Sequence, residues 1–136
     1  MPAPTPTGIK LLREARVLEV RYADGTQFSM PCEYLRVFSP SAEVRGHGLE
    51  EPVLVPGKAQ VNVSQIVPVG RYAVRLVFDD GHDTGLYSWD VLHALGSGQQ
   101  ANWARYLARL QEHGMSRERD LVKLSALPKK YNPPAA

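Results

Sequence analysis

Alternating hydrophobic and polar side chains predict a β-hairpin near the start of the chain. Leu18, Val20 and Tyr22 alternate with charged residues, and Asp24-Gly25 separates them from a second short run over residues 26–30. Alternation with a period of two is typical of a strand with one buried face. Asp-Gly favours a tight hairpin turn because both residues tolerate positive φ. A short helix over residues 32–38 is expected to follow.

The same plan returns 56 positions later along the chain. Segment 18–25 (LEVRYADG) aligns with segment 74–81 (VRLVFDDG), and each is followed by a short strand and then by a helix, from Ser88 to Leu95 in the second unit. One strand-turn-strand-helix unit leaves a hairpin face uncovered, so two units are expected to share a core. The pattern predicts an α+β domain, an antiparallel β-sheet with helices packed on it. Coincidence between two ordinary hairpins is the alternative.

The second half of the chain adds a further strand region and another helix. Val61, Val63 and Ile66 indicate the strand region. Ser97 and Gln100 match a capping box, in which a Ser side chain and a Gln three residues later satisfy the first amides of a helix. Trp103, Leu107 and Leu110 then form a hydrophobic stripe at helical spacing, with Trp103 expected in the core.

The domain boundaries follow from composition. Residues 1–8 are rich in Pro and Thr and are expected to form a flexible arm. The domain is expected over residues 9–114, with its longest irregular stretch at residues 43–58. Residues 115–136 are mildly basic and are expected to be partly disordered, with Ser116 beginning a last short helix.

Length and composition predict a single soluble domain. The chain has 136 residues, 43% of them hydrophobic, and a net charge of +2. That charge is weak for a nucleic-acid-binding protein of this size, and no apolar run approaches the roughly 20 residues of a membrane span. The one cysteine cannot form an internal disulfide. A cytoplasmic protein with no nucleic-acid or membrane partner is therefore expected.

The second turn contains more titratable residues than a hairpin turn requires. Asp80 and His82 stand where the first unit has Asp24 and Thr26, and Asp79 and Asp83 flank them, so four titratable residues gather beside the glycine. Imidazole and carboxylate suit a divalent transition metal such as iron. We therefore expect His82 and Asp80 to be candidate metal ligands, with His47 as a second imidazole. The alternatives are that His82 fixes the turn or contacts a partner.

No recognisable catalytic motif is present. The chain lacks the G-x-S-x-G turn of a nucleophilic serine and the glycine patterns that bind phosphates or dinucleotides. A non-enzyme is therefore expected. Tyr87 and Trp89 are candidate partner contacts, because Tyr and Trp often anchor interfaces. Core packing is the alternative for Trp89, and Arg36 either faces a partner or pairs with Glu33 or Asp90.

Two segments resemble one known family. Segment 72–89 (YAVRLVFDDGHDTGLYSW) and segment 35–47, with its LR, SPSAEV and GH pieces, are similar to the gamma-butyrobetaine hydroxylase-like N-terminal domain, also called DUF971. The resemblance covers roughly residues 10–113 and is nearer to the stand-alone bacterial members. In the eukaryotic hydroxylases this domain precedes an oxygenase domain, for which 136 residues leave no room.

The resemblance also carries expectations about cofactors and partners. The hydroxylases bind zinc through three cysteines and a histidine, and by position these ligands fall on Ser39, Ser41, Val44 and His82. Only the histidine is retained, so no structural zinc is expected. The family's fusion to Mrp-type P-loop ATPases that carry iron–sulfur clusters implies a role in iron–sulfur or metal handling.

Two functions remain open from the sequence. The first is a small non-catalytic adaptor that binds a protein partner, with the iron–sulfur carrier ATPase implied by the resemblance. The second is a metal-binding accessory protein that uses His82.

Overall fold

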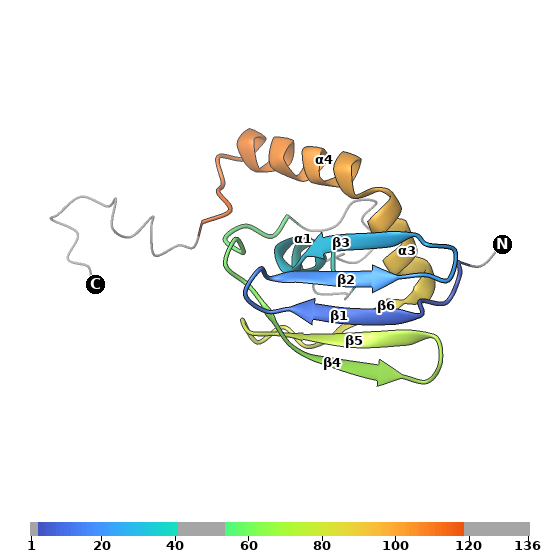
Figure 1. Cartoon of the computed structure of the whole chain (residues 1–136). Coiled ribbons are helices and arrows are strands. Elements are labelled where there is room, and N and C mark those ends of the chain that lie inside the picture. The colour runs from blue at the N-terminus through green and yellow to red at the C-terminus, as the bar shows by residue number, and fades with distance from the viewer. Residues whose placement is uncertain (1–2, 41–53, 119–136) are drawn as a thin grey trace, which may run out of the picture.

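The computed structural model describes residues 3–40 and 54–118. This part of the chain forms two antiparallel sheets of three strands each, and a helix follows each sheet directly (Figure 1). The first unit comprises β1 (Gly8–Leu12), β2 (Val17–Arg21), β3 (Gln27–Pro31) and α1 (Cys32–Val37). The second comprises β4 (Val63–Val69), β5 (Ala73–Phe78), β6 (Gly85–Ser88) and α3 (Trp89–Ser97), after which comes α4 (Gln99–Glu112). The expected α+β fold with antiparallel sheet is confirmed.

The turns that follow β2 and β5 have matching geometry. Asp24 Oδ1 accepts a hydrogen bond from the Thr26 amide at 2.9 Å, and Asp80 Oδ1 accepts one from the His82 amide at 3.1 Å. Each turn places its glycine in the left-handed region, Gly25 with a φ of 92° and Gly81 with a φ of 95°. Glycine adopts this conformation without the steric cost that a Cβ brings. The two Asp-Gly pairs therefore build the same reversal.

A third strand precedes each hairpin: β4 lies in the strand region that Val63 and Ile66 indicate, whereas the sequence pattern missed β1. Gly8 at the start of β1 pairs with Arg21 at the end of β2, and β4 pairs with β5 in the same antiparallel manner. The Thr7 amide also donates to the Arg21 carbonyl at 2.7 Å. The expected flexible arm over residues 1–8 therefore has to be shortened, because its last two residues extend the first sheet. Each repeating unit consists of three strands and a helix.

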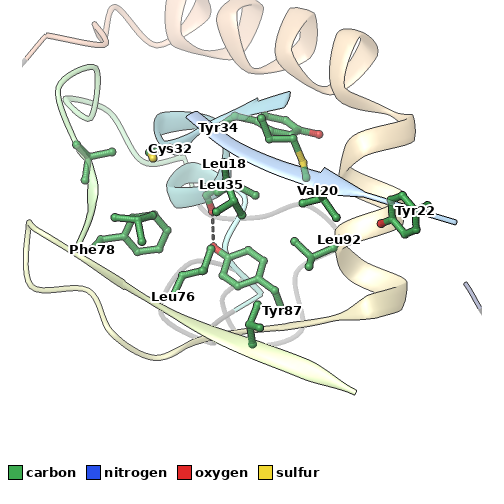
Figure 2. Packing of buried hydrophobic residues seen from close by; sticks show 14 residues of the cluster. Leu18, Val20, Tyr22, Cys32, Tyr34, Leu35, Leu76, Phe78, Tyr87 and Leu92 are labelled. Atoms are coloured by element: carbon green, nitrogen blue, oxygen red, sulfur yellow. Dashed lines mark hydrogen bonds between the residues drawn. The ribbon is translucent and has the colours of Figure 1, made fainter. Parts of the chain in front are cut away.

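Side chains from both units share one hydrophobic core. Leu18 and Val20 of β2 are fully buried, as is Leu76 of β5, and Figure 2 shows them converging between the sheets. The Tyr87 hydroxyl lies in this core and donates a hydrogen bond to the Leu35 carbonyl of α1. Helices α1 and α3 and both sheets thus enclose one main core.

Helix α4 lies along one side of the molecule, beyond α1 and β3 (Figure 1), and has its own smaller core. Tyr106 and Leu110 are buried against Val37, and the Tyr106 hydroxyl donates to the Val55 carbonyl at 2.6 Å. Gly98 precedes the helix, and no side chain caps it. The expected capping box at Ser97 is therefore wrong, because Ser97 is the last residue of α3.

The chain turns back after α4 and pairs with the segment before β4. The Gly57 amide donates to the Ser116 carbonyl and the Ala59 amide to the Arg117 carbonyl, each at 2.9 Å. Most of the expected last helix lies outside the described residues. In the part of the chain that the structure describes, no helix has the length and apolar character to cross a bilayer.

Candidate functional site

Asp80 links the second turn to two other parts of the chain. One of its oxygens, Oδ2, accepts from Arg36 Nε of α1 at 2.8 Å and from Lys58 Nζ at 2.6 Å. Its other oxygen holds the turn through the His82 amide. The Asp80 side chain is only 19% exposed, so these partners compensate a largely buried charge. The carboxylate expected to bind a metal thus forms salt bridges with two basic side chains in this structure.

The surroundings of Asp80 change its acidity. Partial burial on its own raises the pKa of the carboxyl, because the charged form loses hydration. Hydrogen bonds from Lys58, the His82 amide and Arg36, together with the positive charge of Arg36, outweigh this and lower the pKa to about 2. Asp80 is therefore ionised throughout the neutral range.

The His82 ring lies in the protein interior. Its Nε2 is 3.0 Å from Ser39 Oγ, and the residue is only 6% exposed. The ring also lies beside Phe78, with 6.0 Å between the ring centroids. His47 falls outside the described residues, and Asp83 offers its backbone carbonyl to Arg75 Nη1 at 3.0 Å.

These contacts bear on the two metal-site expectations. Across residues 3–40 and 54–118, no three His, Cys, Asp or Glu side chains gather as a metal site requires. Two of the positions that match the zinc ligands of the hydroxylases, Ser39 and His82, do meet in space. Ser41 and Val44 lie outside the described residues. The Ser39 hydroxyl stands where the hydroxylases have a cysteine thiolate, and its contact with His82 is a hydrogen bond between side chains.

The expected partner residues do not form one surface. Tyr87 has no exposed area, so the structure corrects it to a core residue. The Arg36 side chain is 12% exposed and pairs with Asp80 rather than with Glu33 or Asp90. Trp89 is half-buried, and its indole N–H donates to the Arg71 carbonyl at 2.7 Å. These three side chains stabilise the fold from three different elements.

An apolar groove lies between α1 and the helices that follow β6. It has a volume of about 770 Å³. We call it the α1–α4 groove, and its lining comprises Pro31, Glu33, Tyr34, Gly96, Ser97, Gln99, Gln100, Trp103, Ala104, Leu107 and Arg117. Leu107 is 40% exposed, which is a large fraction for a leucine on a helix that packs on a core. The stripe that buries Leu110 thus continues into this open surface.

Hydrogen bonds hold one wall of the groove in place. The Tyr34 hydroxyl donates to the Leu95 carbonyl of α3 at 2.6 Å and accepts from Asn102 Nδ2 of α4 at 3.0 Å. The Tyr34 ring meets Trp103 edge to face, with 6.2 Å between the centroids. One tyrosine therefore connects α1, α3 and α4 beneath the groove.

An ion pair closes the other side of the groove. Arg117 donates two hydrogen bonds to Glu33, at 2.7 Å and 2.8 Å, in a bidentate arrangement. Its guanidinium carbon also lies 5.5 Å from the centre of the Trp103 ring. The Glu33 side chain is only 6% exposed, whereas that of Arg117 is 44% exposed. Arg117 thus places residues 115–118 against α1.

The sequence contained a partial signal for this groove. Trp103 and Leu107 are four residues apart on one helix face, which the periodicity identified as a stripe. Periodicity alone does not distinguish a covered stripe from an open one. The contribution of Glu33, Tyr34 and Arg117 depends on tertiary contacts and has no local signature.

Comparison with known proteins places the chain in a family. The model of the gamma-butyrobetaine hydroxylase-like N-terminal family matches residues 9–93. No curated protein matches the chain significantly.

Three solved structures are similar to the chain. An NMR solution structure has 58% sequence identity, with 86% of this chain and 87% of that chain covered and a TM-score of 0.75. A second has 45% identity, coverages of 87% and 93%, and a TM-score of 0.76. A crystal structure of a DUF971 protein of unknown function from Acidithiobacillus ferrooxidans has 41% identity, coverages of 68% and 92%, and a TM-score of 0.57. The chain belongs to the gamma-butyrobetaine hydroxylase-like N-terminal (DUF971) family.

Proposed function

We propose that this protein is a non-catalytic adaptor that binds an apolar segment of a protein partner in the α1–α4 groove. The observation that carries the proposal is Leu107, which is 40% exposed beside Trp103 in a hollow of about 770 Å³. An exposed apolar surface of this kind, bordered by polar groups, is typical of an interaction site.

The groove has the composition of a protein-binding surface. Trp, Tyr and Arg are the residue types that most often dominate binding energy at interfaces, and Trp103, Tyr34 and Arg117 all line it. The hydrogen bonds of Tyr34 and the ion pair of Arg117 hold these side chains in position. A preformed surface loses less conformational entropy on binding.

The polar residues near the second turn favour a structural role over chemistry. Asp80 and Arg36 pair with each other, and the His82 ring is buried beside Ser39. These contacts support an adaptor more than they support a metal-binding accessory protein. Cys32 is buried and forms no disulfide, which fits a cytoplasmic setting.

The family resemblance directs the choice of a first partner. DUF971 domains are also found fused to Mrp-type P-loop ATPases, so we propose such an iron–sulfur carrier ATPase as the partner. The experiment titrates the isotope-labelled protein with the purified ATPase and follows its backbone and indole signals by NMR. Signals of Trp103, Ala104 and Leu107 are expected to shift or broaden.

Two matched variants identify the binding surface. Leu107→Glu places a charge in the groove, and Leu86→Glu changes a leucine of nearly equal exposure, 42%, on the second sheet. Leu107→Glu is expected to weaken binding at least tenfold, and Leu86→Glu is expected to leave it unchanged. Equal weakening by both variants contradicts the groove. Absence of any binding by the wild-type protein removes the ATPase as partner.

A further inference from the structure

The described part of the chain ends at the groove itself. Arg117 lines the groove and is held there by Glu33, and the Ser116 and Arg117 carbonyls pair with residues 57–59. Residues 119–136, the last 18 of the sequence, therefore start from a fixed point beside Trp103.

The sequence of residues 119–136 contains an apolar cluster close to that point. Leu121, Val122, Leu124 and Leu127 fall within seven positions of one another. Four residues carry the chain from Arg117 to Leu121, which span up to about 13 Å when extended. The groove runs along α4 from Gln100 to Leu107, a rise of about 10 Å at the spacing of an α-helix. The apolar cluster is therefore within reach of the whole groove.

We propose that residues 121–127 of the same chain occupy the α1–α4 groove and compete with the protein partner for it. This inference rests on the proposed function, because it concerns regulation of that same surface. The groove offers Trp103, Ala104 and Leu107 as apolar contacts, and the segment offers leucine side chains to cover them.

Covalent attachment makes this occupant effective even when its contacts are weak. A segment tethered by a short linker has an effective concentration in the millimolar range at a nearby site. Occupancy of nine-tenths of the grooves lowers the apparent affinity of a competing partner about tenfold, because only the open fraction binds. The protein partner binds in the α1–α4 groove when it displaces residues 121–127.

The first test changes the segment within the full-length protein. Leu121→Ser with Leu124→Ser removes two apolar side chains, and Lys129→Ser with Lys130→Ser, just beyond residues 121–127, is the control. The leucine variant is expected to shift the NMR signals of Trp103 and Leu107 and to raise the affinity for the ATPase about tenfold. The lysine variant is expected to change neither. Unchanged Trp103 and Leu107 signals in the leucine variant overturn the proposal.

The second test measures proximity directly. Cys32 has no exposed area, so a spin label reacts at a new cysteine introduced by Ser125→Cys. The label is expected to broaden the indole signal of Trp103 more than that of Trp89, which lies at the opposite end of α3 from the groove. Equal broadening of the two indoles, or none, overturns the proposal.

A mixed sample separates this occupant from a second copy of the chain. Spin-labelled protein without isotope is mixed with isotope-labelled protein without spin label. Broadening of Trp103 in the mixture shows that one chain docks on another and overturns occupancy within the chain. If Trp103 is unaffected by the segment but shifts when the ATPase is added, the inference fails and the proposed function stands. If the ATPase binds and Trp103 still does not shift, the groove itself fails as the binding surface.

Discussion

The carboxylate of Asp80 accepts a hydrogen bond from Arg36 Nε at 2.8 Å, and this contact ties the turn after β5 to helix α1. We expect Asp80→Asn to keep the turn, because the amide oxygen still accepts from the His82 amide. The charge opposite Arg36 and Lys58 is lost, which is expected to reduce the free energy of unfolding by roughly 1–3 kcal/mol. Urea denaturation at pH 7 measures the change. Asp24→Asn, in the equivalent first turn, is the control and is expected to cost less.

The same residue predicts how stability depends on pH. The pKa of Asp80 is about 2 in the folded protein, whereas an unperturbed Asp has a pKa of about 3.9. Because the folded value is the lower one, this contribution is complete above about pH 4 and is lost as the pH falls toward 2. Denaturation curves between pH 7 and pH 2 are expected to show a smaller acid loss for Asp80→Asn than for the wild type. Equal acid losses contradict this assignment.

The shared core predicts that the two units unfold together. Val20 of the first unit and Leu76 of the second are both fully buried in one cluster. Val20→Ala and Leu76→Ala are each expected to lower stability by roughly 1–5 kcal/mol, according to how the cavity relaxes. Circular dichroism and tryptophan fluorescence are expected to report one coincident transition for each variant. Two separate transitions indicate that the halves are independent.

The ligand positions inherited from the family predict folding without zinc. Ser39 stands at one of the three thiolate positions, and its hydroxyl lies 3.0 Å from His82 Nε2. Serine is a poor zinc ligand compared with a cysteine thiolate. The melting temperature of protein purified without a histidine tag is expected to stay the same when EDTA is added. A lower melting temperature with EDTA, together with zinc found by elemental analysis, contradicts this prediction.

The ion pair beside the groove predicts strong coupling between its two residues. Glu33 is nearly buried, so Arg117→Ala leaves a carboxylate without its partner. We expect this variant to lose roughly 1–3 kcal/mol of stability. In a Glu33→Gln background, Arg117→Ala is expected to cost less, because no buried charge remains. A double-mutant cycle measures the difference, and strictly additive losses show that the pair contributes nothing.

Local patterns predicted the elements whose signals lie within a few neighbouring residues. The alternation of Leu18 and Val20 located β2, and Asp24-Gly25 located its turn. Ser88, where the predicted helix begins, caps α3, since its hydroxyl accepts from the Val91 amide at 3.1 Å. In each case the residues that determine the structure are close together in the sequence.

Other features depend on partners that are distant in the sequence. Strand β1 follows a Pro- and Thr-rich stretch, and its assignment rests on pairing with β2. Tyr87 is an interface residue type by composition, yet the Leu35 carbonyl, 52 positions away, holds its hydroxyl in the core. The α1–α4 groove likewise brings Glu33 to Arg117, which is 84 positions distant. No local pattern reports such contacts.

The strand order has a consequence for how the protein folds. In each sheet every strand pairs with its neighbour in the chain, as Gly8 does with Arg21 and Ala73 with Ser88. Closing such short loops costs little chain entropy and leads to rapid folding. Each three-stranded meander can therefore form from its own residues, and we expect the slow step to be the packing that buries Leu18 of one meander with Leu76 of the other.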